Sequence, residues 1–542
     1  MSTAVFDSPS GVTPAQARRQ AGCAGVLALS LFVAASWNLS IVGFDSRFVL
    51  FAQEMLRHGP GFFPTTYGEP YADYSAFSTW LIYLGALPFG QVTSFSAWLP
   101  TSLASAVTVG LMYRLLVPYS RSWAWLSVAL LLLSNTFITE TRSVSLDQML
   151  ATVTFAVFYL AYAADHFAAP RRLGWIFVLL ALGFAIRGPI GLVVPTGVVC
   201  SYYLLSGQWR RLLTFAPAAA VLLVACAAVL LSLAWLSGGE AFLAEVLRMQ
   251  VTSRMDGTEG ASPPFWYFTS AMGNYALAYP LALLALVVVG LSGRRQPTPA
   301  LSLFYLCAFA AATVMVGLSI PQAKKARYIL PMAPMLAIMA AYPFQVSTGK
   351  AFAVLRGTTL AICCCIPGVL VATLWAVRSR LPQTFGDIMP LLAALVAAQL
   401  LALALLMSAR WRLHGLPACA VLAVWGTYIT VVETVQRRLY DTQRFTQQVL
   451  EVKREDDLPL LLHQMGKDAK GIKFMVNVHE DLRPLFTDTR EQLEASQWPA
   501  YVMMSRDDWQ ALEHSRLSDA PVLLNGHFDN DDYVLLRVSA TR

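Results

Sequence analysis

The sequence predicts a polytopic α-helical membrane protein that carries a small soluble α/β domain at its C-terminal end. Of the 542 residues, 56% are hydrophobic and only 13% are charged, and the mean hydropathy is +0.54. Soluble domains carry about 25% charged residues, so most of this chain cannot face water. Apolar runs recur between residues 22 and 433, and charged and polar residues return over 434–542.

The apolar runs predict about thirteen transmembrane helices, because a span needs roughly 20 apolar residues. The runs cover residues 22–43, 96–117, 123–138, 148–165, 173–186, 187–205, 213–236, 272–291, 301–318, 327–346, 352–374, 386–408 and 417–433. The stretch 76–90 is short and contains Pro88. We interpret it as a helix that lies along the membrane interface rather than as a span.

The distribution of basic residues predicts the orientation of these helices. With segment 1–21 in the cytoplasm, basic residues occupy the cytoplasmic connections at Arg114 to Arg121, Arg171-Arg172, Arg210-Arg211, Arg294-Arg295, Lys350 to Arg356 and Arg410 to Arg412. We therefore expect a membrane domain over 22–433 whose loops at about 44–95, 139–147, 237–271 and 319–327 face outward. The soluble domain, 434–542, is then also outside, in the periplasm of a Gram-negative bacterium.

The net charge of +7 does not indicate nucleic-acid binding, because most basic residues sit singly or in pairs at the ends of apolar runs. All eight cysteines lie in or beside apolar segments, which argues against a disulfide scaffold and against a cysteine-based metal site.

The soluble domain has short alternating or apolar runs that predict strands at Ile472–Asn477, Tyr501–Met504 and Tyr533–Val538. Helical patterns occur at Thr442–Lys453 and Glu491–Ser496. These elements predict a small α/β domain.

Candidate functional residues are ionisable groups that lie against apolar surface or on the side where the topology rule does not place them. Asp45 and Arg47 follow the first run, and the aromatic-rich loop after them contains Asp73 and Tyr74. A second group precedes the run 148–165 and contains Arg142 and Asp147. Asp147 has an alternative role, because an acid at a helix N-terminus favours the helix dipole.

The third group is a cationic cluster, Lys324, Lys325 and Arg327, on the predicted outer side. Lys and Arg bind phosphate, so a lipid phosphate is the simplest ligand, although attraction to anionic head groups is the alternative. Arg187 and Arg254 form a looser outer group. Carboxylates next to a cluster of basic residues suit glycosyl transfer from a lipid phosphate. The basic residues neutralise the phosphate leaving group, and a carboxylate activates an acceptor hydroxyl.

In these features the chain resembles the polyprenyl-phosphate-sugar-dependent membrane glycosyltransferases of the GT-C fold. The branch that it resembles contains the aminoarabinose lipid A transferases, which are related to protein O-mannosyltransferases. The residues that carry the resemblance are Asp45-Ser46-Arg47-Phe48, Arg142 with Asp147, Arg187-Gly188-Pro189, Phe242-Leu243 through Arg254 with Phe265-Trp266-Tyr267, and Lys324–Arg327 with Tyr328-Ile329-Leu330-Pro331.

The resemblance implies that Asp45 and Asp147 are catalytic and that transfer inverts the anomeric carbon. Substrate-binding roles then fall to Arg47, Asp73, Tyr74, Arg142, Arg187, Arg254, Lys324, Lys325 and Arg327. The family has Glu-Lys-Pro-Pro where this chain reads Asp73-Tyr74-Ser75-Ala76, and its loop histidine has no counterpart near Met249 and Gln250. We therefore assign no cofactor, and a divalent metal stays an open alternative that the sequence does not indicate.

The leading hypothesis is a periplasm-facing transferase of the bacterial inner membrane. Its donor would be a polyprenyl-phosphate sugar and its acceptor lipid A, other lipopolysaccharide, a glycan or a protein. A flippase or transporter for lipid-linked sugars is the second hypothesis, although transporters more often show paired repeats and midplane charges. An inactive scaffold relative is the third, and the retained Asp45, Asp147 and basic cluster argue against it.

Overall fold

The computed structural model describes residues 11–539 except 74, 168, 170–171, 253–261, 293–297, 347, 381–387, 457, 481, 513–516 and 518–519. The chain divides into two compact units. The first contains Met1–Ala35, Pro70–Ser78 and Trp98–Ile429, and the second contains Ser36–Glu69, Thr79–Ala97 and Thr430–Arg542.

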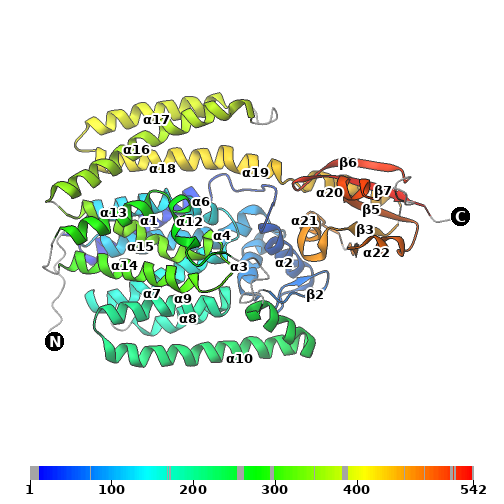
Figure 1. The fold of residues 1–542 in the computed structure, drawn as a ribbon, viewed down its shortest axis with the longest axis horizontal. Coiled ribbons are helices and arrows are strands. Elements are labelled where there is room, and N and C mark those ends of the chain that lie inside the picture. Colours follow the sequence, from blue (N-terminus) through cyan, green and yellow to red (C-terminus); the bar gives the residue numbers. More distant parts are fainter. Residues whose placement is uncertain are drawn as a thin grey trace. The chain divides into compact units, whose positions relative to one another are not determined.

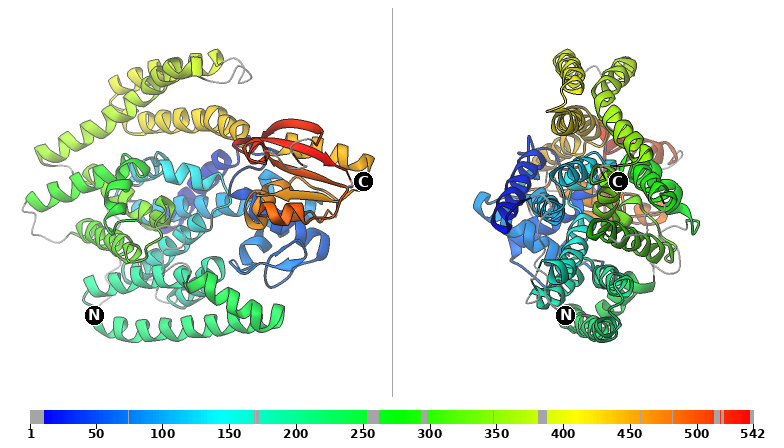
Figure 2. Two further views of the ribbon diagram at one scale, coloured as in Figure 1. Left: turned by 45° about the vertical axis from the view of Figure 1, so that its right-hand side comes forward. Right: turned by 90° about the vertical axis from the view of Figure 1, so that its left-hand side faces the viewer.

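The first unit is helical, and Figures 1 and 2 show its long helices running side by side. The 3-10 and π segments carry the label η. The elements are α1 (Pro14–Phe32), α4 (Ser94–Leu116), α5 (Arg121–Leu132), α6 (Asn135–Thr141), α7 (Leu146–His166), α8 (Gly174–Arg187), α9 (Pro189–Leu205), α10 (Trp209–Leu247), η3 (Arg248–Thr252), α12 (Trp266–Asn274), α13 (Ala278–Leu291), α14 (Pro299–Ser319), η4 (Ala326–Met332), α15 (Ala333–Ala341), η5 (Tyr342–Phe344), α16 (Lys350–Val377), η6 (Arg378–Arg380), α17 (Met389–Met407) and α18 (Arg412–Thr427).

Among the described residues, seven helices are long and apolar enough to cross a membrane, or nine if each sharply bent pair counts as one span. The bent pairs are α5 with α6, at 71°, and α12 with α13, at 112°. Helices α8 and α9 are apolar but have only 14 and 17 residues. The chain is therefore a mostly helical multi-pass protein, and the total of thirteen spans stays a prediction.

Helix α1 ends earlier than the run 22–43 predicts. Its last residue is Phe32, and Ala35 and Asn38 adopt φ angles of 52° and 49°. A residue with a left-handed backbone conformation cannot continue a right-handed helix. The chain therefore turns here, although the sequence stays apolar. The run therefore predicted the start of an apolar segment correctly and its helical extent incorrectly.

Hydroxyl groups join α4 to α7 inside the first unit. The Thr108 and Thr152 hydroxyl oxygens lie 2.9 Å apart, and the backbone N–H of Ser145 donates to Thr101 Oγ1 over 3.2 Å. Thr101 and Thr108 are fully buried. Such bonds between membrane helices contribute about 0.6–2 kcal/mol each. They hold the N-terminal end of α7, which carries Asp147.

The second unit contains a five-stranded mixed sheet with the order β4-β3-β5-β7-β6. The strands are β3 (Leu460–His463), β4 (Leu485–Thr487), β5 (Ala500–Ser505), β6 (Val522–Phe528) and β7 (Asp531–Val538), and a two-stranded ribbon is formed by β1 (Thr65–Thr66) and β2 (Glu69–Pro70). Strand β3 is parallel to β4 and β5, and β7 is antiparallel to β5 and β6. In this register Met503 of β5 faces both Leu462 and Leu535, which places a continuous apolar row on the sheet.

The remaining elements are α2 (Asp45–His58), α3 (Phe77–Ala86), η1 (Leu87–Phe89), η8 (Tyr428–Val432), α19 (Glu433–Leu439), α20 (Gln443–Glu455), η9 (Gly466–Lys470), α21 (Gly471–Met475), α22 (Arg490–Glu494) and α23 (Arg506–Gln510). Within the second unit, Gln53 and Arg57 of α2 donate to the backbone carbonyls of Val476 and Val478, over 3.1 and 2.6 Å. Residues 36–69 therefore pack into the same unit as the C-terminal segment.

Two strands of the soluble segment are confirmed, because β5 and β7 include Tyr501–Met504 and Tyr533–Val538. Helices α20 and α22 lie at the predicted helical patterns. The predicted strand Ile472–Asn477 is wrong, since its first four residues belong to helix α21. Ile472 and Met475, three positions apart, are both buried, and a short apolar run does not by itself separate strand from helix.

Candidate functional site

The site is built around Asp147, which lies in the first turn of α7 after the capping residue Ser145. Arg187, the last residue of α8, places Nε 3.2 Å from Asp147 Oδ1. Arg327, in η4, places Nε 3.1 Å from Asp147 Oδ2. Three residues that are far apart in the sequence thus form one ion-paired group.

This group carries a net positive charge, because one carboxylate faces two guanidinium groups. The side chains of Asp147 and Arg187 are each 8% exposed, whereas that of Arg327 is 22% exposed. Arg187 Cζ also lies 5.4 Å from the centroid of the Tyr328 ring. Two guanidinium groups that are largely shielded from water attract an anion such as a phosphate. Arg327 is the more exposed of the two.

A glycine next to this group leaves room for the Gln250 side chain. Gly188 follows Arg187 with a φ of 63°, and a Cβ atom there would lie 2.9 Å from Gln250 Oε1. The Gln250 amide in turn donates to the backbone carbonyl of Asp73. The Asp73 side chain is buried. Gln250, which sequence reasoning considered only as a position without the family's histidine, therefore lies beside Gly188 and bonds the backbone of Asp73.

Arg142 has a different environment from the other predicted cations. It is 3% exposed, and its Nη1 donates to the carbonyls of Phe32 and Ala34 over 2.7 Å each. Its Cζ lies 5.3 Å from the Trp98 ring. These contacts satisfy carbonyls at the end of α1, where a helix leaves its last C=O groups without intrahelical partners. Arg142 thus stabilises the C-terminal end of α1 through these hydrogen bonds.

The two lysines of the predicted cluster differ in exposure. Lys324 is half-buried, and its Nζ donates to the carbonyls of Pro321 and Ser262, over 2.7 and 3.2 Å. Lys325 is exposed. Of the three basic residues predicted together, Arg327 is the one that pairs with Asp147.

Asp45 and Arg47 belong to the second unit, in the first turn of α2. Asp45 is 8% exposed. Arg47 Nη2 donates to the carbonyl of Asp468 over 2.9 Å, and its Cζ lies 5.8 Å from the Phe44 ring. Tyr74 and Arg254, the other predicted residues, lie outside the described residues.

Tyr328 and Gln250 are the neighbours to which sequence reasoning gave no role. The Tyr328 ring lies against Arg187, which is distant in the chain, so its position directly after the basic cluster does not predict the contact. Gln250 likewise has no sequence signal, because its contact with Asp73 joins distant segments.

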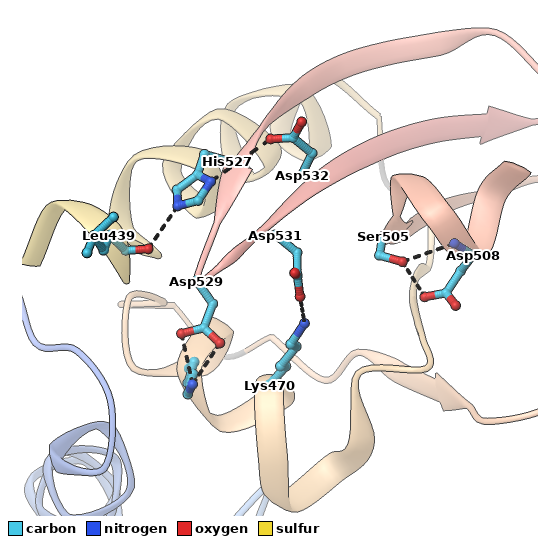
Figure 3. Close-up of polar contacts among 9 residues, drawn as sticks. Leu439, Lys470, Ser505, Asp508, His527, Asp529, Asp531 and Asp532 are labelled. Atoms are coloured by element: carbon cyan, nitrogen blue, oxygen red, sulfur yellow. Dashed lines mark hydrogen bonds and ion pairs between the residues drawn. The ribbon is translucent and has the colours of Figure 1, made fainter. Parts of the chain in front are cut away.

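The second unit also contains a polar cleft with a volume of 660 Å³. Figure 3 shows the Lys470–Asp531 ion pair, the Ser505–Asp508 hydrogen bond and His527 between Leu439 and Asp532. Burial acts against the charged form of Lys470, but its hydrogen bonds to Asp531 and Tyr533 raise its pKa. In the part of the chain that the structure describes, no group of three or more His, Cys, Asp and Glu side chains could hold a metal ion.

Comparison with known proteins gives a matching sequence family, described as dolichyl-phosphate-mannose-protein mannosyltransferase, over residues 73–235. Relatives named undecaprenyl phosphate-alpha-4-amino-4-deoxy-L-arabinose arabinosyl transferase are also similar. The protein from Pseudomonas aeruginosa strain UCBPP-PA14 is 28% identical over 312 residues, which are 54% of each chain. A relative from Sodalis glossinidius is 27% identical over 361 residues, 62% of this chain and 61% of its own.

The chain thus spans about half the length of the curated relatives that it matches. Its fold, in contrast, matches over nearly the whole length. The crystal structure of ArnT from Cupriavidus metallidurans bound to undecaprenyl phosphate gives a TM-score of 0.66 at 17% identity, covering 97% of this chain and 99% of that one. The apo structure gives 0.67 at 16% identity, covering 98% and 100%.

These likenesses and the apolar helices indicate a multi-pass protein of the inner membrane. The chain has the GT-C fold, and its predicted resemblance to polyprenyl-phosphate-sugar glycosyltransferases of the aminoarabinose transferase type is confirmed.

Proposed function

We propose that the chain is an inner-membrane glycosyltransferase that moves a sugar from a polyprenyl-phosphate donor to an envelope acceptor at the periplasmic face. The single observation that carries the proposal is the ion-paired group of Asp147, Arg187 and Arg327. Its net positive charge fits a phosphate that gains negative charge as it leaves. Preorganised cations aimed at developing charge are among the largest contributions to catalysis.

The reaction follows from this arrangement. The acceptor oxygen attacks the anomeric carbon, the bond from that carbon to the phosphate oxygen breaks, and the electron pair leaves with the polyprenyl phosphate. Arg327, the more exposed cation, contacts the phosphate, and Arg187 supports it. Attack from the face opposite the phosphate inverts the anomeric carbon.

Asp147 acts in this scheme as a positioning residue. Both of its oxygens are engaged by guanidinium groups, so the carboxylate holds the two arginines in place instead of receiving a proton. Where the acceptor is a hydroxyl, Asp45 stays the predicted acceptor of its proton, a role that the resemblance implies. A lipid A phosphate is already nucleophilic and needs no such base, so its transfer does not depend on Asp45.

The name of the similar relatives supports an undecaprenyl-phosphate aminoarabinose donor, and the resemblance to aminoarabinose lipid A transferases points to lipid A as the acceptor. Lipopolysaccharide sugars, other glycans and protein hydroxyls are the remaining acceptors of the same proposal. The loops at about 44–95, 139–147, 237–271 and 319–327 and the soluble segment 434–542 face the periplasm in this arrangement.

The test is product formation by the purified full-length protein, with a panel of synthetic polyprenyl-phosphate sugars and an envelope extract. We expect one donor to be consumed and its sugar to appear on one acceptor class. An Asp45→Asn variant that stays active identifies a phosphate acceptor, and one that fails identifies a hydroxyl acceptor.

A transport function is the competing candidate, because the bent pairs α5/α6 and α12/α13 resemble the broken helices of transporters. The same preparation, reconstituted in vesicles, separates the two. Movement of the intact donor across the bilayer, without release of polyprenyl phosphate, would replace transfer by transport.

A further inference from the structure

A second pocket lies at the opposite end of α7 from Asp147. It has a volume of 720 Å³, and residues from the C-terminal ends of α7 and α9 and from the first half of α14 line it together with Ser206 and Gln208. These three helices lie side by side in the first unit (Figure 1). Asp165, in the last turn of α7, lines the pocket, and a helix rise of 1.5 Å per residue places it about 27 Å from Asp147. The pocket is therefore distinct from the candidate site.

One end of the pocket is polar and is organised around the Asp165 carboxylate. Oδ2 accepts hydrogen bonds from the Tyr202 hydroxyl, over 2.7 Å, and the Gln208 amide, over 2.6 Å. Oδ1 accepts one from Arg211 over 2.5 Å. A carboxylate has about four acceptor positions, so beside these described donors one position remains on Oδ1 for a further donor.

The first turn of α14 adds a second polar group, a hydroxyl that can donate a hydrogen bond to an anion. Ser302, in this turn, lines the pocket with a half-buried hydroxyl. The backbone N–H groups of Leu301 and Ser302 are bonded to Thr298, so the Ser302 hydroxyl is the donor that this turn offers to an anion, next to the positive end of the helix dipole. The polar end of the pocket thus presents a carboxylate for a cation beside a hydroxyl that can donate to an anion.

The other end of the pocket is apolar and follows α14 toward the middle of that helix. Tyr305 and Phe309 are 40% and 39% exposed, and the small side chains of Ala308 and Ala312 line the pocket beside them. These residues continue the lining along α14 beyond Ser302. A wall of this kind accommodates a hydrocarbon chain.

We propose that this pocket binds one phospholipid whose head group carries a primary amine, as in phosphatidylethanolamine. The ammonium donates to Asp165 Oδ1, the phosphate lies at Ser302 and the start of α14, and an acyl chain runs past Phe309 and Ala312. A choline head group has no N–H to donate, and a glycerol head group has no cation. In the predicted topology, the connections 171–172, 210–211 and 294–295 make this the cytoplasmic leaflet.

The test is lipid retention by the full-length protein, measured by native mass spectrometry after exchange into detergent with equal amounts of phosphatidylethanolamine, phosphatidylcholine and phosphatidylglycerol. We expect one ethanolamine lipid per protein, with a preference of about tenfold or more over choline, which corresponds to one charge-assisted hydrogen bond. Equal retention of the three lipids would overturn the proposal.

Two matched pairs of variants locate the site. Asp165→Asn should abolish the preference for ethanolamine over choline, whereas Arg211→Gln, which removes the ion pair but leaves the carboxylate, should keep it. Ala312→Phe should expel the lipid, whereas Val316→Phe, one turn further along α14 and outside the pocket lining, should not. If Arg211→Gln loses the preference as fully as Asp165→Asn, or if Ala312→Phe retains the lipid, the assignment is wrong.

Discussion

Replacing Asp147 by Asn tests the ion-paired group directly, because it removes the negative charge and nearly preserves the shape. In the protein, the carboxylate lies 3.2 and 3.1 Å from two guanidinium nitrogens, and its side chain is only 8% exposed. Breaking a buried ion pair by removing one partner costs about 3–5 kcal/mol, since the remaining charge stays unpaired. The variant leaves two such charges facing each other.

Part of this cost should appear as lower thermal stability and part as slower transfer. With about half of this ion-pair cost, ~1.5–2.5 kcal/mol, falling on the transition state, we expect the transfer rate to fall by about 10–100-fold. The fall should be in kcat rather than KM, because displaced arginines stabilise the developing phosphate charge less well. Single-turnover transfer and the midpoint of thermal inactivation measure the two effects.

The matched control is Glu494→Gln, which removes an exposed ion pair with Arg490, four residues away on α22. Exposed pairs contribute about 0–1 kcal/mol, so this variant should behave as the wild type. Wild-type stability and turnover in Asp147→Asn would refute the positioning role. Equal losses in both variants would show that the assay reports general damage.

Three further predictions concern residues around the site and in the second unit. Gly188→Ala should lower thermal stability by about 1–3 kcal/mol and weaken transfer, because its φ of 63° and the 2.9 Å approach to Gln250 both oppose a Cβ atom; a wild-type melting midpoint would contradict this. Arg142→Gln should destabilise the protein by about 1.5–3 kcal/mol through the lost carbonyl contacts and leave the donor KM unchanged, so a raised KM at normal stability would assign it to substrate instead. Burial lowers the pKa of His463 in strand β3, so the neutral form is favoured in the folded state and its contribution to stability, present above about pH 6.5, is lost as the pH falls through the lowered pKa. Hydrogen exchange of the β3 amides between pH 7.5 and 5 measures this, and His463→Gln should flatten the dependence.

The class of fold was predictable because membrane helices are encoded locally, by runs of apolar residues and by basic residues at their ends. The bends were not predictable in this way. The run 123–138 contains the break between α5 and α6, and the break between α12 and α13 lies where apolar residues continue. Hydropathy averages over such breaks, so it predicts where the chain is apolar better than where each helix ends.

The members of the candidate site were predicted one by one, but not their grouping. Asp147, Arg187 and Arg327 each stood out as charges beside apolar segments, and only the fold brings them together. Arg142 stood out for the same reason, yet it binds the carbonyls at the end of α1. An unusual charge in a membrane protein therefore indicates a buried partner without specifying whether that partner is a substrate or the backbone.

The most direct test of the central claim is the affinity of the purified protein for polyprenyl phosphate, measured for Arg327→Gln, Arg187→Gln and the control Arg211→Gln. Arg211 pairs with Asp165 at the other end of α7, so its replacement removes an Arg–Asp pair without touching the site. The account predicts about 10–100-fold weaker binding in the first two variants and unchanged binding in the control. Unchanged binding in Arg327→Gln and Arg187→Gln would contradict it, because the cationic group would then not hold the phosphate that leaves in the reaction.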